Sequence, residues 1–333
     1  MPNRFAKNKT FGYNCLMPKQ KNTPSLEPYK GVRDFYPEDM AVQNHIFSVW
    51  RNAAENAGYV EYSASILEPA DLYRSKGSDE IVNEQMYVFK DKGDREVALR
   101  PEMTPSLARM IAAKRKALKF PLRWYSIPNC FRYERPQRGR RREHWQLNCD
   151  LMGIAGIEAE VEIISLAHSI MKAFGAKDED FEIRINSRKL LHELYTPILK
   201  DPTKPEKMFS LMDKKEKMEK DEFDSAWKEL FTGPFKEPTR LSSPRLDQVM
   251  GTLEEKGVKT KFDYSTTRGF DYYTDIVFEV FDTNPENRRS LFGGGRYDNL
   301  LEMFGVEPVP TVGFGMGDVT IKDFLITHNL PLK

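Results

Sequence analysis

The sequence predicts an α+β fold in which an antiparallel sheet is flanked by helices. Segments with strand-like alternation are interspersed with helical stripes, and they do not follow a regular strand–helix–strand series. Neither a G-x-G-x-x-G segment after a strand nor a Walker-type phosphate loop occurs, which disfavours the common nucleotide-binding folds. The 333 residues correspond to about two domains, or to one large domain with an insertion.

The composition is that of a globular protein. Hydrophobic residues make up 40% of the chain and charged residues 30%, enough for both a core and a polar surface. No run of about 18 apolar residues occurs, so no membrane span is expected. Cys15, Cys130 and Cys149 lack metal-ligand spacing, and their odd number argues against a disulfide framework, which favours the reducing cytoplasm. The net charge of +1 leaves only local patches to indicate an anionic partner.

The first 28 residues differ from the rest. They contain five basic residues against one acid, Glu27, and they show no apolar period. We expect residues 1–28 to form a flexible basic tail.

Elements can then be assigned in chain order. Pro37-Glu38-Asp39 opens a helix to about residue 57, because acids favour the positive end of a helix and apolar residues follow at helical spacing. Thr104-Pro105 opens a second helix, and residues 157–171 carry a third helical stripe. Strands are predicted at residues 59–66, 86–89, 97–99, 124–131, 145–153, 181–185, 276–281 and 311–316, with a hairpin turn at 91–94.

The chain changes character between residues 186 and 262. Charges of both signs crowd residues 204–229, while Phe223, Trp227, Leu230 and Phe231 fall on one helical face. This range is predicted to be a small helical insertion domain. Residues 29–185 and 263–333 would then form the main domain around it.

The densest chemical signal lies between two predicted strands. Residues 132–142 contain six arginines. Arginine forks bind phosphate oxygens bidentately and keep their charge, so this strand–loop–strand is suited to a triphosphate and an RNA backbone. Gln146 and Asp150 follow on the return strand, and their spacing of four residues puts both on one face.

Three further segments offer groups for a polar pocket. Glu102 lies on a prolyl turn at 99–104. Arg268 begins the segment Arg-Gly-Phe-Asp-Tyr-Tyr, which ends at Tyr273 and precedes a strand. Gly-Gly-Gly-Arg-Tyr-Asp at 293–298 permits close approach of a backbone to a ligand, although three glycines alone more often indicate a turn.

Together these motifs resemble histidyl-tRNA synthetase, a family of class II aminoacyl-tRNA synthetases. The resemblance runs from about Tyr29 to Leu325 and includes the entry segment Gly31–Pro37, the turn at 99–104, the arginine segment through Asp150 and both signatures at 268–273 and 293–298. It implies the class II antiparallel sheet, an insertion domain at 186–262, a homodimer, a cytoplasmic location and no membrane. The implied reaction uses ATP with Mg²⁺ and no metal cage of protein ligands, joining L-histidine to tRNA(His).

The resemblance also implies roles for individual residues. Arg132 would hold the α-phosphate and the histidine carboxylate, and Arg268 would stabilise the transition state, which makes both catalytic. The implied histidine-binding residues are Glu102, Thr104, Arg132, Gln146, Asp150, Arg268, Tyr272, Tyr273 and Tyr297. The implied ATP-binding residues are Arg132, Glu134, Arg140 and Arg142. The implied contacts to the tRNA acceptor end are Gln137, Arg138 and Arg141.

Two features depart from the family pattern. The third class motif usually ends in Gly-x-Glu-Arg with the arginine on ATP, whereas Thr320 stands at that position here. The sequence ends at Lys333, so we expect a catalytic core without the C-terminal anticodon-binding domain, either as a fragment or as a naturally short chain.

Two other functions fit part of this pattern. One is the non-catalytic, synthetase-like regulatory subunit of ATP phosphoribosyltransferase in histidine biosynthesis. The other is a paralogue that activates histidine without charging tRNA. Retention of Arg132, Arg140, Gln146 and Arg268 favours the histidine–tRNA ligase.

Overall fold

The computed structural model describes residues 25–75, 81–215, 218–238, 243–269, 272–287 and 289–333. Most of the predicted basic tail lies outside these ranges, and residues 25–28 are exposed. No helix in the described ranges is long and apolar enough to cross a membrane.

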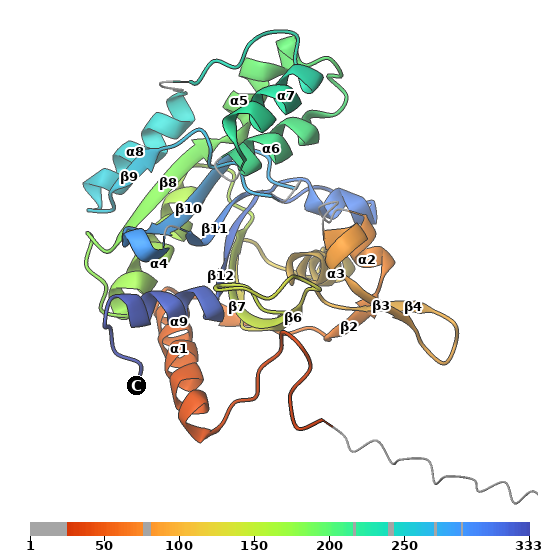
Figure 1. Ribbon diagram of the computed structural model, residues 1–333, viewed down its shortest axis with the longest axis vertical. Coiled ribbons are helices and arrows are strands. Elements are labelled where there is room, and N and C mark those ends of the chain that lie inside the picture. Colours follow the sequence, from red (N-terminus) through yellow and green to blue (C-terminus); the bar gives the residue numbers. More distant parts are fainter. Residues whose placement is uncertain (1–24, 76–80, 216–217, 239–242, 270–271, 288) are drawn as a thin grey trace, which may run out of the picture.

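A large sheet lies at the centre of the molecule (Figure 1). In the described residues it has nine strands in the order β1-β5-β7-β12-β11-β10-β8-β9, with β6 paired to β7. The pairs β1–β5 and β8–β9 are parallel and the others are antiparallel, as expected for an α+β fold. The strands are β1 (Val60–Glu61), β5 (Leu122–Ser126), β6 (Asn129–Phe131), β7 (Glu143–Met152), β8 (Phe181–Ser187), β9 (Thr260–Phe262), β10 (Ile276–Asp282), β11 (Ser290–Arg296) and β12 (Thr311–Gly317).

Four long helices pack against one face of this sheet. They are α1 (Pro37–Asn56), α4 (Glu158–Ala173), α8 (Pro244–Glu255) and α9 (Asp318–Thr327). Their apolar stripes meet the inward side chains of the strands in the main core, where Trp50, Phe278 and Phe324 are fully buried. The predicted helix starts are confirmed for α1, which has a proline at its first position and acids in its first turn.

A smaller core lies on the opposite face. There α3 (Thr104–Lys114) packs on the short helix η5 (Leu300–Phe304) and on Met152 and Val277 of the sheet. Beside it stands a small sheet of β2 (Leu67–Pro69), β4 (Glu96–Leu99) and β3 (Tyr87–Lys90), next to α2 (Asp71–Arg74) and the π-helix η1 (Ile81–Gln85). The polar side chains described below lie on this face.

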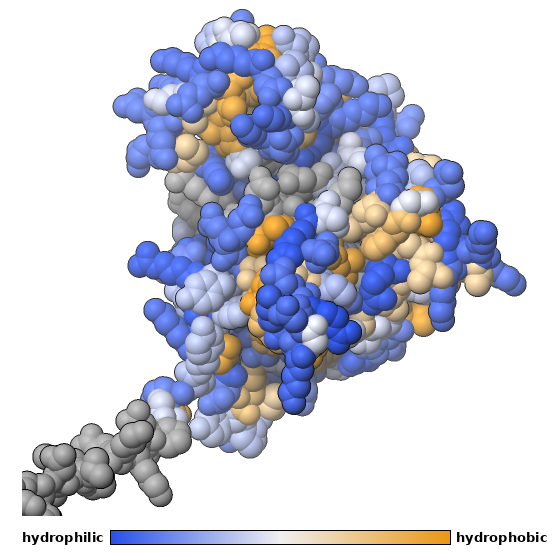
Figure 2. Space-filling model, turned by 90° about the vertical axis from the view of Figure 1, so that its right-hand side faces the viewer, coloured by the Kyte–Doolittle hydropathy of each residue, from blue (hydrophilic) through white to orange (hydrophobic). Residues whose placement is uncertain are grey.

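The range 186–262 contains two parts. Helices α5 (Arg188–Tyr195), α6 (Pro205–Lys214) and α7 (Lys220–Leu230), with the 3₁₀ turn η2 (Thr196–Ile198), surround their own aromatic core, in which Trp227 stacks on Phe231 at 3.7 Å between ring centroids. Figure 2 shows this unit at the top, with a mostly hydrophilic surface on which some hydrophobic residues are visible. By contrast, α8 packs in the main core and β9 joins the large sheet.

The structure differs from the sequence expectations at three places. The strand predicted at 59–66 has only the residues of β1, and the one predicted at 124–131 is split into β5 and β6 around Pro128, which cannot donate a ladder hydrogen bond. The glycines at 293–295 lie in the central strand β11 rather than in a turn. A side chain at Gly294 would come within 2.0 Å of the Gly313 carbonyl oxygen, so the neighbouring strands leave room only for glycine.

Candidate active site

Strand β7 supplies one wall of the site through simple alternation. Leu147, Cys149 and Leu151 point into the main core, whereas Gln146 and Asp150 line a pocket on the other face. The shared face predicted for Gln146 and Asp150 is therefore confirmed. Asn148 lies between them on the same face and lines the same pocket, which the spacing of two residues implied and sequence reasoning overlooked.

Strand β12 makes room for these side chains. Gly313 pairs with Asp150 and Gly315 with Asn148 in the antiparallel ladder. A methyl group on Gly313 would lie 2.2 Å from Oδ1 of Asp150 and 2.8 Å from the Cys149 carbonyl oxygen. The glycine therefore lets the carboxyl group lie flat against the sheet, where water is largely excluded.

The turn after β4 supplies the opposite wall. Its residue Glu102 is 3% exposed, and Thr104 begins α3. Arg132 follows β6, and its Nε donates a 2.9 Å hydrogen bond to the Pro101 carbonyl oxygen. This bond ties the arginine of one segment to the turn that carries Glu102, so both are positioned together.

Three tyrosines and Arg268 close the pocket from the segments around β10 and β11. The Tyr272 hydroxyl donates to Oε2 of Glu102 (3.4 Å), and the Tyr297 hydroxyl donates to Oδ1 of Asp150. The rings of Tyr272, Tyr273 and Tyr297 lie 4.9–6.3 Å apart between centroids. The main chain of Arg268 has φ +60°, an uncommon conformation for a residue other than glycine.

Glu279 on β10 holds the Arg268 guanidinium. Nη1 of Arg268 lies 2.6 Å from Oε1 of Glu279, and Nη2 donates to the Gly293 carbonyl oxygen at 3.3 Å. Although burial disfavours its charge, the Glu279 carboxylate raises the pKa of Arg268 above its usual value. Sequence reasoning missed Glu279, because in the sequence it is an acid inside an ordinary strand.

All nine predicted histidine-binding residues line this one pocket. It bounds about 370 Å³ of unfilled space, part of it open to solvent. Among the described residues, the buried Oε1 of Glu102 and Nε of Arg268 lack a hydrogen-bond partner. Buried polar atoms are normally paired, so a polar ligand in the pocket would satisfy them. The nine residues are Glu102, Thr104, Arg132, Gln146, Asp150, Arg268, Tyr272, Tyr273 and Tyr297.

The two pocket acids are poised near neutral pH. Burial raises the pKa of Glu102 to about 7, with Arg132 and Tyr272 acting in the opposite direction. Burial likewise raises the pKa of Asp150 to about 7, although the Tyr297 hydrogen bond favours its charge. A cationic ligand would therefore stabilise the ionised form of both acids.

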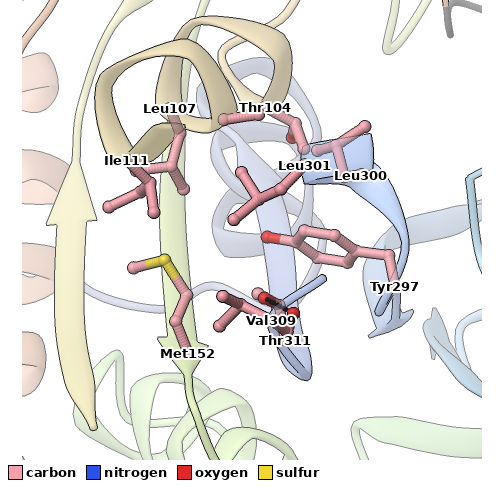
Figure 3. A pocket seen from close by; sticks show the side chains of 10 residues that line it. Thr104, Leu107, Ile111, Met152, Tyr297, Leu300, Leu301, Val309 and Thr311 are labelled. Carbon is pink, nitrogen blue, oxygen red and sulfur yellow. Dashed lines mark hydrogen bonds between the residues drawn. The ribbon is translucent and has the colours of Figure 1, made fainter. Parts of the chain in front are cut away.

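An apolar recess adjoins the polar pocket. Thr104 and Tyr297 line both, and the rest of the recess is lined by Leu107, Ala108, Ile111, Met152, Leu300, Leu301, Val309 and Thr311. Figure 3 shows Leu107 and Ile111 of α3 pointing toward Met152 and Val309 across this space. The Tyr297 ring thus has polar surroundings at its hydroxyl and apolar surroundings along its side.

The residues predicted for ATP and tRNA lie on the 132–142 segment outside this pocket, apart from Arg132. Arg140 forms an ion pair with Glu134 (3.6 Å). Arg142 is buried, stacks 3.8 Å over the Tyr133 ring and donates to the Tyr29 hydroxyl, so it anchors the entry segment in this structure.

The three residues predicted to contact tRNA lie at the loop tip. Arg138 and Arg141 are exposed, and Gln137 forms a β-bridge with Arg140. Arg138 folds back onto the rest of the protein, donating to the Glu286 carbonyl oxygen (3.2 Å) and to Oγ1 of Thr327 on α9 (3.3 Å).

Comparison with known proteins agrees with these motifs. The family model described as histidyl-tRNA synthetase matches residues 31–232 and 234–319. The histidine–tRNA ligase of Leptospira biflexa is 46% identical over 94% of this chain and 77% of its own length. That of Thermoplasma volcanium is 40% identical over 89% of this chain and 74% of its own length.

Solved structures show the same fold at lower identity. A histidine–tRNA ligase subunit from Alicyclobacillus acidocaldarius superposes with a TM-score of 0.74 at 22% identity, over 92% of this chain and 98% of that one. A protein described as an ATP phosphoribosyltransferase regulatory subunit/histidyl-tRNA synthetase, from Bacillus halodurans, has a TM-score of 0.74 at 22% identity, over 90% of this chain and 83% of that one. The family model and the sequence relatives, rather than these distant structures, show that the chain belongs to the histidyl-tRNA synthetase family.

Proposed function

We propose that the polar pocket is where this histidine–tRNA ligase binds L-histidine and activates it with ATP. The observation that carries the proposal is the convergence of nine residues from four separate segments of the chain on one pocket. Two acids with raised pKa values, two arginines and three tyrosines match the ammonium, carboxylate and imidazole groups of histidine.

In the first step, a carboxylate oxygen of histidine attacks the α-phosphorus of ATP and pyrophosphate leaves, giving histidyl-adenylate. Two anions must meet, so cationic groups that are already in place supply most of the catalysis. We assign Arg132 and Arg268 to this role because both line the pocket and each is oriented by further protein groups. Mg²⁺ bound together with ATP would neutralise part of the charge of its phosphates.

We assign Glu102 to the histidine ammonium group and Asp150 to the imidazole. Glu102 has a buried oxygen without a partner in the described residues, and Asp150 is oriented by Tyr297. Pockets with buried hydrogen-bonding groups reject analogues that lack the matching nitrogens, since such analogues leave those groups unpaired.

In the second step, a hydroxyl of the terminal tRNA nucleotide attacks the activated carbonyl carbon and AMP leaves. We assign Gln137, Arg138 and Arg141 to the acceptor end, because they sit at the tip of an arginine-rich loop.

This function implies a cytoplasmic location. We also propose a homodimer through α1 and β1, since Tyr36, Met40 and Val60 are large hydrophobic residues left 38–69% exposed there.

Histidine-dependent exchange of pyrophosphate into ATP tests the activation step, and charging of tRNA(His) tests the transfer step. Exchange with histidine alone among the amino acids is expected, and Asp150→Asn should abolish most of it. Lack of exchange would refute the pocket assignment, whereas exchange without charging would favour the paralogue that only activates histidine. Light scattering at micromolar concentration tests the dimer, and a monomeric mass would contradict it.

A further inference from the structure

Thr320 stands in the first turn of α9, where the family pattern has an arginine. Its hydroxyl Oγ1 donates to the Leu291 carbonyl oxygen (2.7 Å) and to that of Gly317 (3.1 Å), which ties the first turn of α9 to the start of β11. The side chain is uncharged and its only proton is committed to these contacts. Thr320 itself therefore cannot take over the phosphate contact of an arginine.

Arg289 brings a guanidinium close to this point from the position just before β11. Phe292 of β11 pairs with Met316 of β12, so the residues before β11 lie beside those that begin α9. A methyl group placed on Gly139, at the tip of the arginine-rich loop, would lie 3.7 Å from Cγ2 of Thr320 and 3.9 Å from Nη1 of Arg289. Gly139 thus rests against both side chains.

Two arginines of the same loop are already engaged. Arg138 reaches Thr327 and lies 3.7 Å from the Asp323 carboxylate, and Arg140 pairs with Glu134. Arg289 is exposed, and Nη1 of its side chain donates a 2.5 Å hydrogen bond to the Arg138 carbonyl oxygen. A guanidinium has five N–H donors, so this bond leaves donors for a ligand.

We propose that Arg289 supplies the guanidinium that Thr320 lacks and binds the polyphosphate of ATP. The proposal rests on the proposed function, because it requires that the protein binds ATP and that the polyphosphate lies between the arginine-rich loop and the start of α9. An arginine fork suits this ligand, since it binds phosphate oxygens bidentately and never loses its charge. The contact to the Arg138 carbonyl oxygen would hold Nη1 while the other donors face the phosphates.

The test measures KM for ATP and for histidine in pyrophosphate exchange with the wild type, Arg289→Gln and Arg289→Lys. Loss of charge-assisted hydrogen bonds to phosphate should raise KM for ATP roughly tenfold or more. KM for histidine should stay within about twofold, because Arg289 does not line the histidine pocket. Arg289→Lys should recover only part of the loss, since it keeps the charge without the fork.

Two further variants sharpen the result. Arg95→Gln removes an exposed arginine on the β3–β4 hairpin and should leave both KM values unchanged, which controls for net charge. Thr320→Arg in the Arg289→Gln background should restore KM for ATP, because it returns a guanidinium to the same place. An unchanged KM for ATP in Arg289→Gln, an equal rise in both KM values, or no recovery by Thr320→Arg would overturn the proposal.

The proposed function can fail independently of this inference. Absence of exchange in the wild type would refute the function, and calorimetric titration of MgATP into wild type and Arg289→Gln would then still test the binding role. Equal ATP affinity in the two proteins would overturn that role.

Discussion

Replacing Glu279 by glutamine should remove the ion pair that orients the Arg268 guanidinium in the pocket, while leaving the fold intact. The Arg268–Glu279 pair has a 2.6 Å contact between side chains that are only 15% and 14% exposed. A hydrogen bond between charged groups contributes about 1.5–3 kcal/mol. Glutamine keeps one acceptor oxygen, and the Gly293 carbonyl oxygen still accepts a hydrogen bond from Nη2 of Arg268. We therefore expect an energetic cost in the lower half of this range.

The effect should fall on catalysis more than on binding. If Arg268 is less well oriented, the transition state should be stabilised by about 1.5–2 kcal/mol less. This corresponds to a roughly 10- to 30-fold lower rate of pyrophosphate exchange. KM for ATP should change less than the rate, because the charge of Arg268 remains. Arg268→Lys should lose about two orders of magnitude in exchange, since it lacks the planar fork that both Glu279 and the phosphate engage.

Exchange and thermal unfolding should be measured on the same preparations, with Glu182→Gln as the matched control. Glu182 contacts Arg184 at the same 2.6 Å distance on the adjacent strand β8, but this pair is 32% and 23% exposed and lies outside the pocket. Loss of the Glu182–Arg184 ion pair should lower the free energy of unfolding by at most about 1 kcal/mol and should not change the exchange activity. If Glu279→Gln exchanged pyrophosphate like the wild type, Glu279 would not position Arg268, and unchanged exchange in Arg268→Lys would remove that arginine from the catalytic residues.

Four other outcomes follow from the structure. Gly313→Ala should abolish histidine binding and lower the melting temperature, because its methyl group would meet both Asp150 and the Cys149 backbone; calorimetry with histidine checks this, and wild-type affinity would contradict it. Because the pKa values of Glu102 and Asp150 are both about 7, KM for histidine should rise as the pH falls below about 7, and a flat profile from about pH 6 to 8 would refute the assignment of these acids. The same raised pKa values mean that the unliganded fold binds more protons than the unfolded chain, so these groups should lower its thermal stability as the pH rises from about 4 to about 7. Affinity for tRNA should fall steeply between ~50 and ~200 mM salt, and its constancy would rule out an electrostatic role of the arginine-rich loop.

Local patterns were sufficient for much of the fold and for most of the pocket. Helical stripes and end signals placed α1, α3 and α4, and the alternation of β7 put Gln146 and Asp150 on one face. These features depend on contacts between residues close in the sequence, which is why a period of 3.6 or 2.0 reveals them. The resemblance of the motifs to a known family added pocket residues from distant segments of the chain, which the periodicity of side chains cannot connect.

The sequence by itself therefore determined the fold class, the family and nine of the residues that line the proposed histidine pocket. Only the tertiary structure decided that Glu279 holds Arg268, that Gly313 makes room for Asp150, and that Arg289 and Thr320 both lie near Gly139. Each of these contacts depends on which strands become neighbours and in what register. Strand order is set by packing of the whole sheet against its helices, so no local spacing in the sequence reports it.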